Sequence, residues 1–101
     1  MSQKWESLLN NLGHVSRKLG KYADALEFHR RALVLSPLSA STFCAIGYTQ
    51  ALMGDATEAV EAFHKALGIR REDAFATAMI NNVVEGLIAE DLPFEGKRES
   101  V

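Results

Sequence analysis

The chain has 101 residues, of which 48% are hydrophobic and only two are prolines, enough for one small domain with a modest core. Its 11 basic and 13 acidic side chains give a net charge of −2, too near neutral to favour nucleic acid or an anionic membrane as a partner. A single cysteine, Cys44, excludes an intrachain disulfide, and no apolar run reaches the roughly 18 residues that span a bilayer. We therefore expect a protein of the nucleus and cytoplasm that binds neither nucleic acid nor membrane.

The first predicted unit, residues 6–39, contains two helices. Gly20 lies where the first helix must end and reverse, a position that favours a residue tolerating positive φ, and Pro37 closes the unit. The apolar residues recur at the spacing of one helix face: Leu9, Leu12 and Leu19 in the first helix, and Ala25, Phe28, Ala32 and Leu35 in the second.

The second unit, residues 40–73, repeats this pattern, and a third begins at Ala74 with one helix to about residue 89. Gly54 marks the reversal inside the second unit, and Asp55 with Glu58 resembles a capping box for the helix that follows. Asp73 is placed to cap the last helix. The apolar face comprises Phe43, Ile46, Met53, Ala59, Phe63, Ala66 and Ile69, followed by Ile80, Val84 and Leu87 in the third unit.

The units repeat with a period of 34 residues. Gly13 and Gly47 recur at one phase inside helices, where each glycine costs about 1 kcal/mol relative to alanine, so we expect two helices to cross closely there. His29 stands where Phe63 stands one repeat later, which predicts looser packing in the first unit. This period with its glycine and alanine skeleton is typical of the tetratricopeptide repeat. The predicted fold is an all-α helical solenoid of two full repeats plus one further helix.

These elements divide the chain into a repeat domain, residues 1–89, and an acidic tail, residues 90–101, that we expect to be flexible. Trp5, Leu8 and Val15 lie outside the main stripe of the first helix, and the last helix is apolar around most of its circumference. Because a terminal repeat needs a polar outer face, we predict that an end of the stack is covered by another copy, another subunit or the tail. A homo-oligomer formed through apolar ends is one such arrangement.

Several segments resemble subunit six of the anaphase-promoting complex at positions that the bare repeat does not dictate. They include residues 8–15, 29–35 and 63–71, with Asn10, Asn11 and His14 among the distinctive positions. The resemblance covers about residues 4–80. It implies a non-catalytic scaffold in a ubiquitin ligase of the cell cycle, with other subunits of the complex as partners. It also implies that a small accessory subunit is held by these C-terminal repeats.

In a tetratricopeptide stack the first helix of each unit lines a concave groove, which is where we predict a partner peptide. The groove is expected to be polar and partly cationic at one end, and apolar toward Tyr48 and Phe75. Ordinary solvated helix faces are the alternative interpretation. The predicted partner-binding residues are Asn10, His14, Arg17, Cys44, Tyr48, Phe75 and Asn82.

No catalytic or metal site is predicted, and no cofactor. The histidines His14, His29 and His64 fall on different helices without ligand spacing to Cys44, and Cys44 lacks a phased histidine and acid that would make it a nucleophile. Two other functions remain open. One is a chaperone adaptor that binds an acidic C-terminal tail, although the basic clamp this needs is incomplete here, and the other is a self-assembling repeat fragment.

Overall fold

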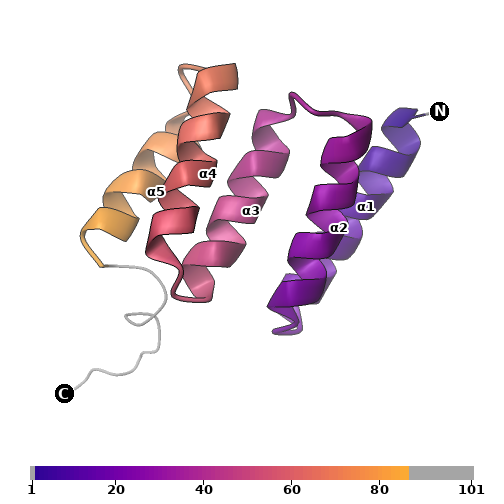
Figure 1. Cartoon of the computed structure of the whole chain (residues 1–101), viewed down its shortest axis with the longest axis horizontal. Helices are drawn as coiled ribbons and strands as arrows, with labels where there is room; N and C mark the ends of the chain where they lie inside the picture. Colours follow the sequence, from indigo (N-terminus) through magenta and orange to yellow (C-terminus); the bar gives the residue numbers. More distant parts are fainter. Residues whose placement is uncertain (1, 87–101) are drawn as a thin grey trace.

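The structure, a computed structural model, describes residues 2–86, with side chains from residue 4 onward, and shows five α-helices (Figure 1). They are α1 (Ser2–Lys18), α2 (Tyr22–Leu35), α3 (Ala40–Leu52), α4 (Ala56–Ile69) and α5 (Ala74–Val84). Within this part of the chain there is no strand, and the predicted all-α solenoid is confirmed. The end of the last predicted helix, residues 87–89, and the predicted tail, residues 90–101, lie outside the described residues.

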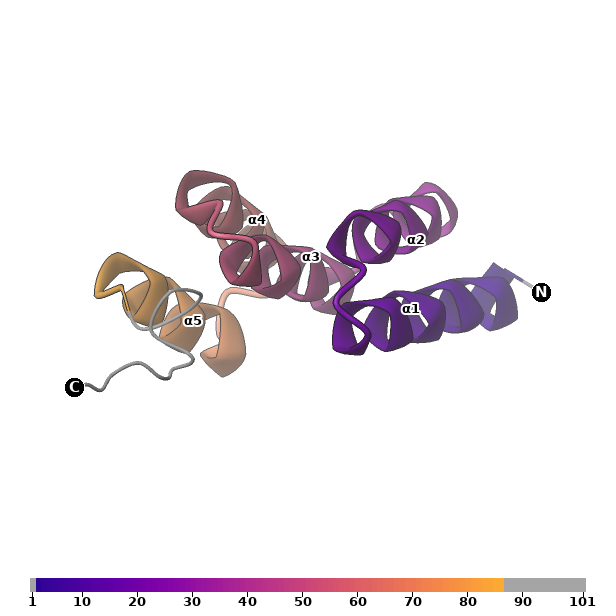
Figure 2. The ribbon, with the colours of Figure 1, turned by 90° about the horizontal axis from the view of Figure 1, so that it is seen from below.

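The helices form two layers in an elongated body. Consecutive helices run antiparallel, with α1, α3 and α5 in one layer and α2 and α4 in the other (Figures 1 and 2). The principal extents are 51 × 29 × 18 Å. Besides its own partner in the antiparallel pair, α3 contacts α1, α2 and α5. Each first helix is therefore a neighbour of the next first helix, which places one continuous face along the solenoid.

The turns follow the predicted chemistry with one exception. Gly20 and Gly54 have φ of 79° and 87°, as a reversal after a first helix requires. Asp73 caps α5, accepting a hydrogen bond from the Ala76 N–H at 2.9 Å, as predicted. The predicted capping box at Asp55 is wrong. Its side chain makes no cap bond, and its backbone N–H already donates to the Gln50 carbonyl at 2.9 Å, so Glu58 has no free donor to reach.

The two helical glycines lie under aromatic rings. A Cβ on Gly47 would lie 2.8 Å from the Phe63 ring, and a Cβ on Gly13 would lie 2.5 Å from the His29 ring. Both rings are fully buried. The predicted close crossing is confirmed, whereas the looser packing predicted at His29 is wrong, because the imidazole fills the site that phenylalanine fills in the next unit.

We therefore expect Gly47→Ala to destabilise the fold by about 1–3 kcal/mol through overpacking, although alanine normally stabilises a helix interior. Urea unfolding followed by circular dichroism measures the effect. Gly68→Ala in α4 is the matched control, because a Cβ there meets nothing within 4 Å, and it should leave stability unchanged or raise it. A Gly47→Ala protein as stable as the wild type would disprove the close contact.

Apolar side chains are exposed at both ends of the solenoid. The described part of α5 buries Ala76 and Met79 but leaves Val84 73% and Phe75 48% exposed. That this end of the stack needs a cover stays a prediction, because residues 87–89 of the predicted helix lie outside the described part of the chain. At the other end, Leu12 and Leu19 of α1 are 38% and 67% exposed. Their predicted place on the packing face is wrong, because α2 packs against the side of α1 that carries Gly13.

Candidate partner-binding groove

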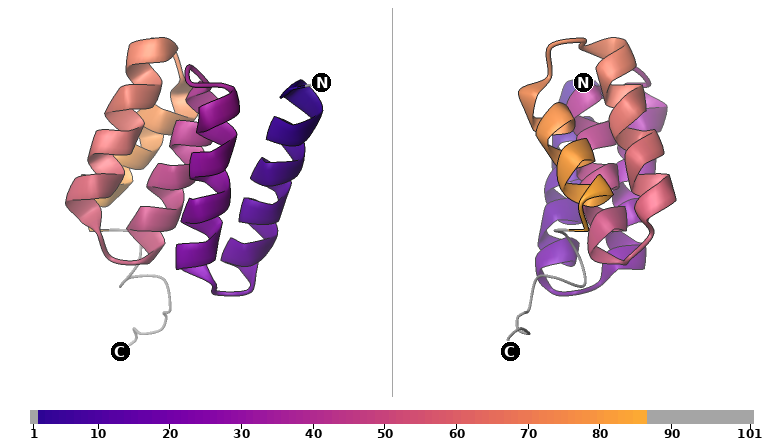
Figure 3. Two further views of the ribbon diagram at one scale, coloured as in Figure 1. Left: turned by 45° about the vertical axis from the view of Figure 1, so that its right-hand side comes forward. Right: turned by 90° about the vertical axis from the view of Figure 1, so that its left-hand side faces the viewer.

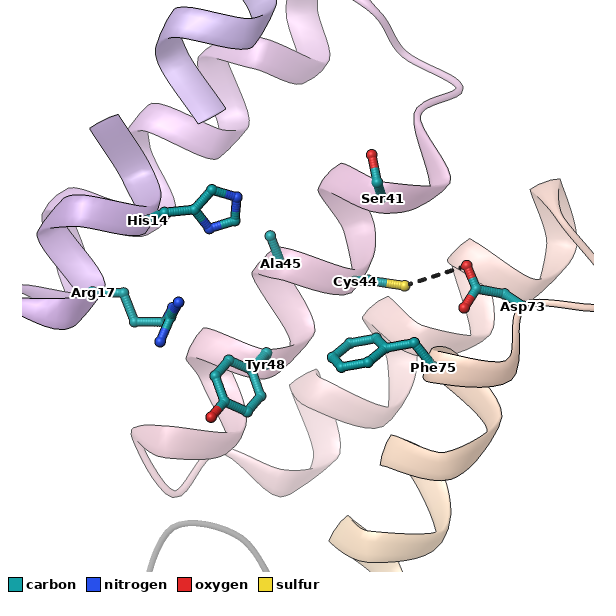
Figure 4. Close-up of a pocket in the computed structure, with 8 residues that line it drawn as sticks. All are labelled: His14, Arg17, Ser41, Cys44, Ala45, Tyr48, Asp73 and Phe75. Atoms are coloured by element: carbon teal, nitrogen blue, oxygen red, sulfur yellow. Dashed lines mark hydrogen bonds between the residues drawn. The ribbon is translucent and has the colours of Figure 1, made fainter. Parts of the chain in front are cut away.

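A groove with a volume of about 510 Å³ opens on the layer formed by α1, α3 and α5. Figure 4 shows the side chains that line it, contributed by the C-terminal half of α1, by α3 and by the start of α5. The structure brings five of the predicted binding residues together here. The lining residues are His14, Arg17, Ser41, Cys44, Ala45, Tyr48, Asp73 and Phe75.

Helix periodicity explains why these residues share one wall. Ser41, Cys44, Ala45 and Tyr48 are separated by three or four residues and so lie on one face of α3. Phe75 is the second residue of α5 and is 48% exposed. Its side chain projects toward α3, as Figure 4 shows. The apolar part of the groove is thus built across two repeats.

Aromatic contacts form the groove wall between α3 and α5. The Phe75 ring lies edge-on to Tyr48, with centroids 6.4 Å apart, and to the buried Phe63, at 6.2 Å. On the other side the Arg17 guanidinium lies 5.0 Å from the Tyr48 ring centroid, within the range of a cation–π contact. Arg17 and Phe75 therefore hold Tyr48 between them while its ring still faces the groove.

Cys44 and Asp73 form the opposite, polar end of the groove. The Cys44 thiol donates a weak hydrogen bond to Asp73 Oδ2 at 3.8 Å. Burial, followed by the neighbouring Asp73 carboxylate, raises the pKa of Cys44 to about 11. The thiol therefore stays protonated at neutral pH, and because the thiolate is the nucleophilic form, this cysteine is suited to packing.

Asn10 lies outside the groove. Its Nδ2 donates to Thr42 Oγ1 at 2.9 Å, and its Oδ1 lies 2.8 Å from Nδ1 of the buried His29. Because the amide oxygen can only accept, this network assigns the His29 proton to Nδ1. The amide of Asn10 thus bonds to His29 within the first unit and to Thr42 of α3, and it is not part of the groove lining.

Asn82 also lies away from the groove lining, with its amide 3.9 Å from Met79 Sδ on α5. Conversely, the predicted set of binding residues did not include Ser41, Ala45 and Asp73, which the structure places in the lining. Ser41 occupies an inward position by its repeat phase, and Ala45 could have been found from its spacing to Tyr48 on one helix face. Asp73 could not, because its sequence position indicated only a helix cap.

The described residues contain no group of three or more histidine, cysteine, aspartate or glutamate side chains placed to hold a metal ion. Among the helices of residues 2–86, none is long and apolar enough to cross a membrane.

Comparison with known proteins places the sequence among repeat proteins. The tetratricopeptide repeat pattern matches residues 6–72. The chain is 55% identical over 93 residues to the Cell division cycle protein 16 homolog of Homo sapiens, covering 92% of this chain and 15% of that protein.

Two further relatives are named as subunits of a protein complex. The chain is 40% identical over 81 residues to Anaphase-promoting complex subunit 6 of Arabidopsis thaliana, covering 80% of this chain and 15% of that protein. It is 35% identical over 82 residues to Anaphase-promoting complex subunit 6 of Dictyostelium discoideum, covering 81% of this chain and 9% of that protein. The chain therefore spans no more than 15% of the length of these relatives.

Proposed function

We propose that this chain, which belongs to the tetratricopeptide-repeat family, is a non-catalytic scaffold that binds a segment of another protein in the groove between α1, α3 and α5. The observation that carries the proposal is the aromatic wall of the groove, in which Phe75 is half-exposed and Tyr48 is held between Phe75 and Arg17. Aromatic and arginine side chains supply much of the binding energy at protein interfaces.

The partner that we propose is a subunit of an anaphase-promoting complex. Its support is the identity of 35–55% to proteins named for that complex or for the cell division cycle. A small accessory subunit is the specific candidate, and nucleus and cytoplasm are the proposed locations.

The charges of the groove bear on what lies in it. Arg17 stands on α1, while Asp73 stands at the start of α5, so a bound segment meets a cationic side and an anionic side. An apolar side chain would pack on Tyr48 and Phe75 between them. Arg17 is the one arginine or lysine among the lining residues, which disfavours the chaperone adaptor, because an acidic tail would need several cations and would meet Asp73.

Tyr48→Ala should reduce recovery of the partner subunit at least about tenfold, since removal of a central interface aromatic commonly costs more than the ~1.4 kcal/mol that a factor of ten represents. The measurement is affinity purification of the tagged chain from extract of dividing cells, with subunits quantified by mass spectrometry. Val34→Ala is the control, because Val34 is 79% exposed on α2, in the layer away from the groove.

Circular dichroism must show that both variants are folded. Equal recovery of complex subunits by the wild type and Tyr48→Ala would exclude the groove as the binding site. Recovery of chaperones without complex subunits would favour the chaperone-adaptor function over the scaffold function.

A further inference from the structure

A second cleft, with a volume of about 200 Å³, opens between α2 and α4. Figure 3 (left) shows α3 flanked by these two helices. The part of α3 that lines the cleft consists of Phe43, Ile46 and Gln50, whose spacing of three and four residues places them on one face of the helix. That face is roughly opposite to the face of α3 that lines the groove. We call this site the outer cleft, and a partner bound in the groove leaves it open.

The walls of the outer cleft carry four exposed charged side chains that do not pair with one another. They are Arg30 on α2 and Glu58, Glu61 and Lys65 on α4. Glu61 and Lys65 are four residues apart, the spacing at which a helix commonly forms an ion pair. Lys65 Nζ instead lies 5.9 Å from the centroid of the Phe43 ring, within the range of a cation–π contact. In the described part of the chain, no ion pair joins any two of these four side chains.

Gln50 adds a hydrogen-bond acceptor that lacks a donor. Its Oε1 is buried and has no hydrogen-bond partner among the described residues, and a buried acceptor in that state is costly. Because α3 and α4 run antiparallel through the turn at residues 53–55, Gln50 lies at the level of Glu58, as Phe43 lies at the level of Lys65. One end of the outer cleft therefore gathers three acceptors, from Gln50, Glu58 and Glu61, and the other end holds a cation.

We propose that the outer cleft binds an extended segment of another polypeptide that carries an arginine, an apolar residue and a carboxylate at alternate positions. The arginine lies at the end formed by Gln50, Glu58 and Glu61. A guanidinium suits this end because it has five N–H donors and no acceptor, and because its hydrogen bonds to carboxylates are charge-assisted.

The rest of the segment is fixed by the remaining lining residues. Its apolar side chain packs on Ile46 and Ala62, which belong to one apolar cluster and lie between the two ends of the outer cleft. Its carboxylate meets Arg30 and Lys65. With both charges of the segment matched, the four unpaired charges of the walls each gain a partner.

The dimensions of the outer cleft favour side chains of an extended segment. Its volume of about 200 Å³ is below the roughly 300–1,000 Å³ of sites that bind small molecules. Gln50 and Phe43 are separated by roughly 10 Å along the axis of α3, and three alternate side chains of an extended chain span roughly 13 Å. The proposal does not depend on what the groove binds.

The test uses the full chain with ¹⁵N only in its glutamine side-chain amides. The chain has two glutamines, Gln3 and Gln50, so its NMR spectrum contains one reporter in the outer cleft and one internal control on α1, assigned with Gln3→Glu. The probe is the peptide acetyl-Arg-Ala-Leu-Ala-Glu-amide. In the control peptide citrulline, which has nearly the same shape without the charge, replaces the arginine.

We expect the probe to shift the Gln50 signal saturably and to leave the Gln3 signal unchanged. The citrulline peptide should bind at least about tenfold more weakly, since a hydrogen bond to a charged group is worth more than the ~1.4 kcal/mol that a factor of ten represents. The double variant Glu58→Gln with Glu61→Gln should weaken binding of the probe by a similar factor.

Two variants control for effects outside the outer cleft. Glu72→Gln removes another exposed carboxylate, which is not in the lining, and should bind the probe as the wild type does. Tyr48→Ala should also retain the shift of the Gln50 signal, which separates this site from the groove.

The proposal is overturned if the folded chain shows no saturable shift of the Gln50 signal, or if the citrulline peptide binds equally well. A Gln50 shift that depends on the concentration of the chain alone would assign the outer cleft to a second copy. A Gln50 shift produced without peptide by Lys97→Gln with Arg98→Gln would assign it to the chain's own residues 90–101. Either result would also overturn the proposal.

Discussion

Phe63→Ala is expected to lower the free energy of unfolding by about 3–5 kcal/mol, the range for removing a buried phenylalanine. Phe63 is fully buried, packs against Gly47 and lies 6.2 Å from Phe75, ring centroid to ring centroid. For a small domain with about 5–15 kcal/mol in total, a loss of this size is a large fraction of the stability.

Chemical denaturation monitored by circular dichroism gives the value. Val34→Ala serves as the control, since the side chain of Val34 is 79% exposed and its truncation should change stability by less than about 0.5 kcal/mol. A loss below about 1 kcal/mol for Phe63→Ala would contradict the assignment of Phe63 as the centre of the second repeat. The same change should also disturb the groove, because Phe75 rests on this ring.

The free energy of unfolding is expected to fall by up to about 3 kcal/mol as the pH is lowered from about 6.5 to 4. Each pKa unit by which the folded and unfolded states differ corresponds to about 1.36 kcal/mol. The cause is His29. Burial, with a smaller contribution from His14 and Arg17, lowers its pKa from 6.5 to about 4. Its Nδ1 is bonded to Asn10, whereas its Nε2 is buried without a hydrogen-bond partner, so a second proton there would be an unpaired buried charge.

The sign follows from proton binding. Between pH 6.5 and 4 the unfolded chain binds a proton at His29 that the folded chain does not, so the stability present above pH 6.5 is lost progressively as the pH falls. Unfolding in urea at a series of pH values measures this slope. His29→Phe should remove most of it, leaving a smaller part from His14, whose pKa is also lowered by burial and by Arg17 and Lys18.

His64→Gln is the matched control, because it removes an imidazole that is exposed on α4. If His29→Phe leaves the pH dependence of stability unaltered, a group other than His29 causes it. Absolute stability is not the readout, since His29→Phe also leaves Asn10 Oδ1 without the Nδ1–H donor.

The repeat fold was predictable from sequence because its determinants are local and recur. Gly20 and Gly54 set the reversals through positive φ, and Gly13 and Gly47 mark the crossings through the absence of a side chain. Five of the seven predicted binding residues meet in one groove because helix periodicity and the 34-residue period together place them on the inner layer. Whether these residues bind a partner remains a prediction.

The remaining features depend on contacts that sequence spacing does not specify. The repeat phase of Asn10 predicts a groove position. Its amide instead forms hydrogen bonds with the His29 ring and the Thr42 hydroxyl at the junction between the two units. Leu12 and Leu19 were mispredicted because apolar spacing identifies a face of α1 without showing which face α2 covers.

The central claim, that the groove holds a segment of an anaphase-promoting complex subunit, is tested most directly by site-specific photo-crosslinking. The photo-reactive amino acid p-benzoylphenylalanine would replace Tyr48 in one protein and Val34 in another, and both would be irradiated in extract of dividing cells. We expect cross-links from position 48, absent from position 34, that map to one segment of a subunit of that complex. Contradiction would be position 48 cross-linking to no such subunit, or both positions giving the same products.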